Sequence, residues 1–177
     1  MATTFSNAGS SVPFAFGTKA ETLARIAPHL RRFVVPYSCY FSIGEWRNDP
    51  DAVLGDLAKH FKEGRIIVRS SAQGEDGAAH SMAGKFKSMV DIPTNRPAPL
   101  RDAIEQVIAS YGRDELAQYS ADQVLVQSML SDVSMSGVLF TQDLNTGAPY
   151  YVINYDDETG RTDTVTSGGA YSNRTLV

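Results

Sequence analysis

Five short apolar runs, rich in β-branched and aromatic residues, constrain the fold of this chain more than any other feature. Runs of this length and composition are typical of β-strands. Asn145, Thr146 and Gly147 supply a turn between the last two runs, so we expect those two to pair as an antiparallel hairpin. The sequence therefore predicts an α+β fold with mostly antiparallel sheets and flanking helices. The five runs are residues 65–69, 86–92, 124–130, 137–141 and 150–155.

Three amphipathic helical patterns separate these runs. Thr18 and Glu21 have the spacing of a capping box, which predicts that the first helix begins there. Asp49 and Pro50 are a typical N-cap and first helical residue for the second helix. Apolar residues at helical spacing between 100 and 111 predict the third. Each pattern has one apolar face, so each helix is expected to pack on a sheet.

Composition excludes several classes of protein. The chain has 177 residues, 42% of them hydrophobic, which is enough for one core. Its formal net charge of -4 disfavours a general nucleic-acid binder, because no basic field is present. No apolar stretch approaches the roughly 20 residues that span a bilayer, so no membrane partner is expected. The single Cys39 is interpreted as a buried, inert thiol, and a cytoplasmic location is expected.

The stretch 66–86 carries the clearest chemical signal. A predicted strand delivers Arg69 into a loop of glycines and other small residues, where backbone amides and a guanidinium can approach an anion. This composition suits phosphate. A flexible hairpin with Arg69 paired to Glu75 or Asp76 fits the same residues, and composition leaves both interpretations open.

Particular segments resemble a known family. VRSSA at 68–72, followed by an acidic pair and S-x-A-G at 81–84, resembles the N-terminal nucleotide-binding domain of phosphoenolpyruvate synthases and pyruvate phosphate dikinases. The resemblance covers residues 16–168 in order. Four more segments contribute to it: 16–20 (FGTKA), 35–41, 124–129 (VLVQSM) and 136–141 (SGVLFT).

The resemblance implies an ATP-grasp fold, in which two α+β lobes hold ATP between them. We expect a flexible N-terminus over 1–15 and an ATP-grasp-like nucleotide-binding domain over 16–177. This domain is expected to be the truncated N-terminal portion of a longer one. Three prolines suggest a surface linker at 93–99 within it.

The resemblance also implies roles for individual residues. Lys19 reaches the phosphates of ATP and Arg69 clamps them, as catalytic groups. Further residues form the phosphate cradle: Ser70, Ser71, Ser81, Ala83 and Gly84. Four others line the adenine slot: Val126, Gln127, Ser128 and Met129.

Simpler interpretations of some of these residues stay open. Val126 and Met129 also fit a hydrophobic core, and Lys19 also fits a solvated helix start. Thr18 and Ala20 replace glycines of the family's lysine element, which reduces close backbone approach to a ligand.

The family uses Mg²⁺ with ATP, but the sequence does not reveal the metal ligands. Asp156, Asp157 and Glu158 stand where the family usually has a glycine-leucine-glycine-glutamate element. Three clustered carboxylates suit a hard cation, and they equally suit a solvated turn.

The implied activity is phosphoryl transfer from ATP, through a histidine on a domain of the same longer chain, to a small-molecule acceptor. Pyruvate and an amide such as L-glutamine are equal candidates, with AMP and phosphate released. The histidine motif is absent from this sequence, so the chain alone is expected to be inactive. Two alternatives are a non-catalytic nucleotide-sensing or docking module, and a structural domain that has lost its ligand.

Overall fold

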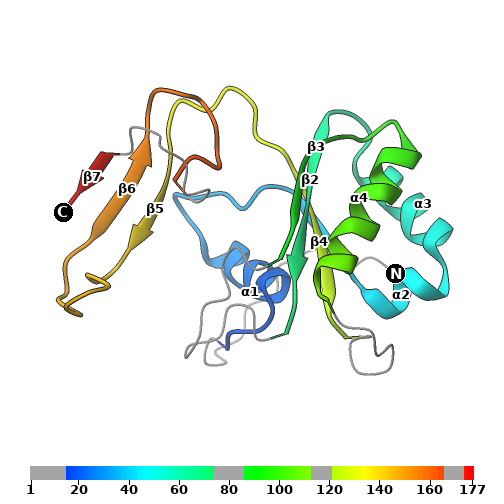
Figure 1. Cartoon of the computed structure of the whole chain (residues 1–177), viewed down its shortest axis with the longest axis horizontal. Helices are drawn as coiled ribbons and strands as arrows, with labels where there is room; N and C mark the ends of the chain where they lie inside the picture. The colour runs from blue at the N-terminus through cyan, green and yellow to red at the C-terminus, as the bar shows by residue number, and fades with distance from the viewer. Residues whose placement is uncertain (1–14, 74–85, 113–120, 166–173) are drawn as a thin grey trace. The chain divides into compact units, whose positions relative to one another are not determined.

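The computed structural model describes residues 15–73, 86–112, 121–165 and 174–177. The chain divides into two compact units, Met1–Met129 and Leu130–Val177. Figure 1 labels their elements. The first unit contains, in chain order, α1 (Lys19–Ile26), the 3-10 turn η1 (Ala27–His29), β1 (Ser38–Ser42), α2 (Ile43–Asn48), α3 (Pro50–His60), β2 (Arg65–Ser71), β3 (Ser88–Pro93), α4 (Pro97–Ser110) and β4 (Gln123–Ser128).

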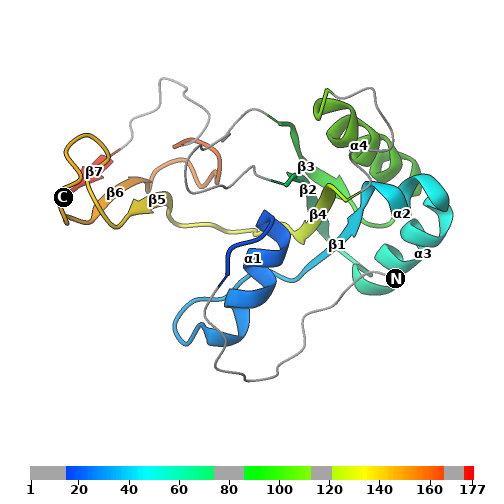
Figure 2. The same cartoon turned by 90° about the horizontal axis from the view of Figure 1, so that it is seen from below.

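A four-stranded antiparallel sheet organises the first unit. Its strand order is β1-β4-β2-β3, so β4 and β2 are the two central strands. Helices α2, α3 and α4 lie on one side of this sheet and α1 lies on the other (Figures 1 and 2). In the described part of the chain, three α-helices therefore cover one face of the sheet and a single α-helix lies on the other.

The hydrophobic core lies between the sheet and α2–α4. Ile66 and Val68 of β2, together with Val124 and Val126 of β4, are at most 1% exposed and face it. Alternation along a strand puts these residues on one face. Cys39 of β1 belongs to the same core, and burial raises the pKa of its thiol, in keeping with the expected inert cysteine.

Local signals set where the helices begin, as predicted. The Thr18 hydroxyl accepts from the Glu21 N–H, and the Glu21 carboxylate accepts from the Thr18 N–H, which completes the capping box of α1. Asp49 caps α3 by accepting from the Ala52 N–H, and Pro50 is the first residue of that helix.

The second unit is a small antiparallel sheet. It contains β5 (Ser136–Phe140), β6 (Val152–Asp156) and β7 (Arg174–Leu176), in the order β5-β6-β7. The predicted β5–β6 hairpin is confirmed, with Leu139 opposite Ile153. In its turn, Asp143 Oδ1 accepts from the N–H groups of Asn145 and Thr146. The polar turn thus closes the hairpin by side-chain to backbone hydrogen bonds.

Other predictions need adjustment. The connection expected at 93–99 is shorter, because β3 extends to Pro93 and α4 already begins at Pro97, in a first turn that tolerates proline. Helix α2 was not predicted, since six residues are too few to show a period. No helix among the described residues is long and apolar enough to cross a membrane. All five predicted strands are present, with ends shifted by up to two residues.

Candidate functional site

Arg69 and Ser71 lie on the α1 side of the sheet. They stand opposite Leu125 and Gln123 of β4, respectively, in antiparallel register. Leu125 is fully buried but does not belong to the core beneath α2–α4. Because side chains alternate along β2, Ser70 points to the opposite, core side, where it is 3% exposed. The end of β2 therefore presents one cation and one hydroxyl toward α1.

The guanidinium of Arg69 differs from that of Arg65, four residues earlier on the same strand. Arg65 is paired with the Asp91 carboxylate and donates to the Asp91 carbonyl oxygen, at the opposite end of β2. The Nε of Arg69 is buried and has no hydrogen-bond partner among the described residues. A buried charged donor of this kind needs an acceptor, and a phosphate oxygen is one that fits.

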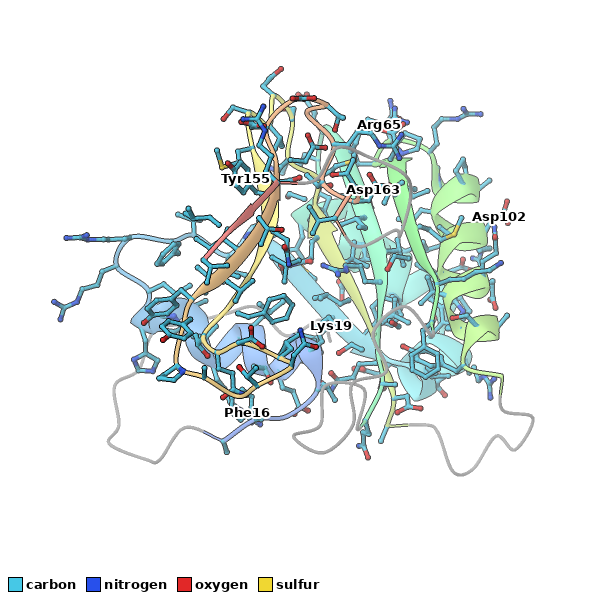
Figure 3. All side chains as sticks on the ribbon, turned by 60° about the vertical axis from the view of Figure 1, so that its left-hand side comes forward. Phe16, Lys19, Arg65, Asp102, Tyr155 and Asp163 are labelled. Atoms are coloured by element: carbon cyan, nitrogen blue, oxygen red, sulfur yellow. The ribbon has the colours of Figure 1, made fainter. Side chains whose placement is uncertain are left out.

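A polar network attaches α1 to the ends of β2 and β4. The Ser71 hydroxyl accepts from the Ala20 N–H at 2.9 Å. The Gln123 amide accepts from the Thr18 hydroxyl at 2.6 Å and donates to the Glu21 carboxylate at 3.0 Å. These bonds hold Lys19, the first residue of α1, beside the sheet. Figure 3 labels Lys19 on α1 and Arg65 toward the other end of the sheet.

The first amides of α1 are occupied within the chain. Ala20 donates to Ser71, Glu21 donates to Thr18, and Thr18 donates to Glu21. A hollow of about 290 Å³ adjoins them, lined by Phe16, Gly17, Thr18, Glu21 and Gln73. Thr18 and Ala20 thus belong to a self-capped helix start. Cationic side chains, rather than these amides, are the groups that α1 and β2 offer to a phosphate.

The predicted cradle residues divide into three groups. Ser71 contacts α1, as described above. Ser70 lies on the core side of the sheet. The third group, Ser81, Ala83 and Gly84, lies outside the described residues. The same holds for Glu75 and Asp76, the possible partners of Arg69, so the hairpin interpretation of that segment stays open.

The predicted adenine-lining residues occupy β4 and the position after it. Val126 is fully buried in the core, which is the simpler interpretation that the sequence left open. The Gln127 side chain donates to the Ser38 hydroxyl at 2.9 Å. The Ser128 N–H donates to the Tyr37 carbonyl oxygen and the Met129 N–H to the Arg65 carbonyl oxygen, each at 2.9 Å. Only Met129, 37% exposed, offers an open surface, and the adenine assignment stays a prediction.

Sequence patterns did not single out three residues that organise this end of the sheet. Gln123 joins β4 to α1. The Asp122 carboxylate accepts from the Gln73 N–H at 2.8 Å. The Tyr111 hydroxyl contacts the backbones of β2 and β4. The sequence shows only an Asp-Gln pair at the start of an apolar run and a tyrosine at the end of an amphipathic helical pattern. Neither feature is specific to a binding site.

The acidic triplet in the second unit forms a turn. The Asp156 carboxylate accepts from the Thr159 hydroxyl and from the N–H groups of Thr159 and Glu158, and these bonds lower its pKa. Asp157 and Glu158 pair with Arg174. Among the residues that the structure describes, no three His, Cys, Asp or Glu side chains gather to hold a metal. The turn interpretation therefore accounts for all three acids.

These features define an α+β domain with a cationic strand end suited to phosphate. Comparison with known proteins goes one step further: the chain belongs to the family described as pyruvate phosphate dikinase, AMP/ATP-binding domain, whose model matches residues 51–168. The chain is also similar to the prodigiosin synthesizing transferase PigC of Serratia marcescens, with 29% identity over 166 residues. That alignment covers 83% of this chain and 18% of PigC, so the chain spans about a fifth of this relative's length.

Proposed function

We propose that this chain forms the ATP-binding portion of a phosphotransferase that resembles phosphoenolpyruvate synthase and pyruvate phosphate dikinase. In this proposal the domain has an ATP-grasp-type fold and works in the cytoplasm within a longer protein. Arg69 and Lys19 hold the phosphates of ATP. The membership of the AMP/ATP-binding domain family supports the choice of nucleotide.

One observation carries the assignment of the site, namely the buried Nε of Arg69 without a partner among the described residues. A guanidinium is permanently charged and presents several donors in a fixed plane, so it can bind two phosphoryl oxygens at once. The Lys19 ammonium adds a second positive charge from α1. Phosphoryl transfer depends chiefly on positioning and charge neutralisation, which are the properties that these two cations supply.

Magnesium fits this proposal as a partner of the nucleotide. Mg²⁺ keeps several water ligands and commonly binds nucleotide phosphates with only one or two carboxylates. When bound, it neutralises phosphate charge. Among the described residues, no three His, Cys, Asp or Glu side chains gather to hold a metal. In this proposal the ion arrives with ATP.

The proposed reaction transfers a phosphoryl group to a histidine on another domain of the same longer chain and then to an acceptor. ATP gives AMP, one phosphoryl group moves to the acceptor, and the other is released to water as phosphate. Pyruvate and an amide such as L-glutamine are the candidate acceptors. The alternative is a nucleotide-sensing or docking module, which would bind ATP without forming AMP.

Replacing Arg69 tests the site directly. In the protein that the native reading frame encodes, we expect Arg69→Ala to weaken ATP binding by about 10- to 100-fold, as for lost hydrogen bonds to a charged group. Calorimetric titration with ATP measures this, and circular dichroism checks that the variant folds. Arg65→Ala is the matched control on the same strand; because it removes only exposed contacts with Asp91, it should change affinity less than twofold. Equal affinities for wild type and Arg69→Ala would remove Arg69 from the site.

The acceptor requires a second experiment. The same protein is incubated with ATP, Mg²⁺ and either pyruvate or L-glutamine, and phosphorus NMR follows the products. Acceptor-dependent AMP with a new phosphorylated species identifies the acceptor. ATP binding without AMP formation in either mixture would reject both acceptors and favour the sensing module.

A further inference from the structure

The hydroxyl of Tyr111 lies between the two central strands of the first unit. Tyr111 follows the last residue of α4, and its side chain is 5% exposed. Its oxygen accepts from the Ser71 N–H at 2.9 Å, and its O–H donates to the Gln123 carbonyl oxygen at 2.5 Å. A tyrosine hydroxyl can act as donor and acceptor at once, and here it does both.

Ser71 and Gln123 form the last pair of the β2–β4 ladder. The same two residues attach α1 through their side chains, Ser71 to the Ala20 N–H and Gln123 to Thr18 and Glu21. The Tyr111 hydroxyl thus holds the backbones of Ser71 and Gln123. The side chains of these two residues in turn hold α1. Lys19 lies between Thr18 and Ala20, which this junction holds. Arg69 lies two residues before Ser71 on β2.

The end of α4 also holds β3 near Arg69. The Ser110 hydroxyl accepts from the Lys87 N–H at 3.0 Å and donates to the Val107 carbonyl oxygen. The Phe86 ring packs on the Tyr111 ring, with centroids 5.1 Å apart. Lys87 leads into Ser88, which pairs with Arg69 across the β2–β3 ladder. Arg69 is therefore flanked by β4, whose first residue accepts from Tyr111, and by β3, whose preceding residues contact Ser110 and Tyr111.

We propose that Tyr111 is a positioning residue of the nucleotide site, which sets the place of Arg69 and of the α1 start through its hydroxyl. The inference rests on the proposed function, because it concerns the same phosphate-binding groups. Tyr111 itself does not touch ATP in this arrangement. Its removal should weaken contacts to the phosphates and leave contacts to the adenosine part unchanged.

Tyr111→Phe tests the inference, because it keeps the ring that packs on Phe86 and removes only the hydroxyl. In the protein encoded by the native reading frame, calorimetric titration should show ATP affinity reduced about threefold to tenfold, with adenosine affinity unchanged. In an Arg69→Ala background the same substitution should reduce ATP affinity by a smaller factor than in the wild type, because one of the two groups that Tyr111 positions is gone. Ile104→Val, a small core change on the same helix, is the control for general loss of stability and should leave ATP affinity unchanged.

The outcomes separate the inference from the proposed function. If Arg69→Ala weakens ATP binding but Tyr111→Phe does not, or if their effects are fully additive, Tyr111 is structural only and the inference is wrong. If Arg69→Ala has no effect, the phosphate site itself is misplaced and the inference falls with it. Should Tyr111→Phe fail to fold, Gln123→Ala tests the same junction, because it removes the side-chain bonds to Thr18 and Glu21 of the α1 start. A loss of ATP affinity of twofold or more is expected for it, and unchanged affinity would overturn the inference.

Discussion

The two units of this chain are stabilised in different ways. In the first unit, α2, α3 and α4 cover one sheet face with a continuous apolar core. In the described part of the second unit, the buried residues are polar, namely Asp156 and Thr164. Its large apolar side chains Leu139, Leu144 and Tyr151 are more than half exposed. Strand pairing and hydrogen-bonded turns thus shape the second unit, whose 48 residues are few for a core of its own.

The same substitution in both units measures this difference most directly. Leu57→Ala should destabilise the protein by about 2–5 kcal/mol, because it leaves a cavity in the core. Leu139→Ala, at a side chain 56% exposed, should change stability by no more than about 0.5 kcal/mol. Urea unfolding, combined with hydrogen exchange that distinguishes the two units, measures both. Similar losses for the two variants would contradict the comparison.

Alanine substitutions at two glycines, one in each unit, should change stability in opposite directions. A Cβ at Gly137 of β5 would lie 2.5 Å from the Asn154 carbonyl oxygen, so Gly137→Ala must shift the β5–β6 pairing, at a cost of about 1–3 kcal/mol. A Cβ at Gly55 of α3 meets nothing within 4 Å, and Gly55→Ala should stabilise the first unit by about 0.5–1 kcal/mol. Hydrogen exchange of the β5 and β6 amides should accelerate only in Gly137→Ala. Unchanged exchange there would show that the sheet tolerates the shift.

The Asp156 turn should make the second unit sensitive to acid. The Thr159 hydroxyl first, and then the backbone N–H groups, lower the pKa of Asp156 in the folded state. The ionised Asp156 carboxylate therefore stabilises the folded unit fully above the unfolded pKa of about 3.9. This contribution is lost as pH falls toward the lower folded pKa. Asp156→Asn should lower the stability of this unit at pH 7, and the difference from wild type should shrink as pH falls below about 4.

Hydrogen exchange of the 156–159 turn at several pH values, with an NMR titration of the Asp156 carboxyl, checks this. Asp157→Asn is the control, since it disturbs only a pair with the half-exposed Arg174 and should have a smaller effect. A difference between wild type and Asp156→Asn that is independent of pH would mean that the charge of Asp156 does not stabilise the turn.

Local sequence was sufficient to predict most of the secondary structure. The capping box at Thr18, the Asp49–Pro50 start of α3 and the hairpin turn at 145–147 depend on neighbouring residues alone, and the structure bears out each of them. The short helix α2 was not predicted, because its buried residues Ile43 and Trp46 belong to a core built from distant segments, as Trp46 shows by donating to Glu105. Periodicity cannot reveal an element that is barely longer than one period and a half.

The candidate site was predictable only in part. The arginine and serines after the apolar run indicated a phosphate site, and the family match over residues 51–168 supports nucleotide binding. Gln123 and Tyr111 were not predicted as parts of it. They act through contacts with residues 12 to 105 positions away, and no local pattern records such contacts.

Sequence alone predicts where most of the helices and strands form, which face of each is apolar, and that a cation ends an apolar run ahead of a glycine-rich stretch. These properties depend on neighbouring residues and on the geometry of one chain segment. The folded structure adds that Arg69 and Ser71 face α1 while Ser70 and Val126 face the core, and that one tyrosine hydroxyl joins both strand ends. Strand register and long-range hydrogen bonds fix these facts, because a shift of one residue would turn every side chain to the other face.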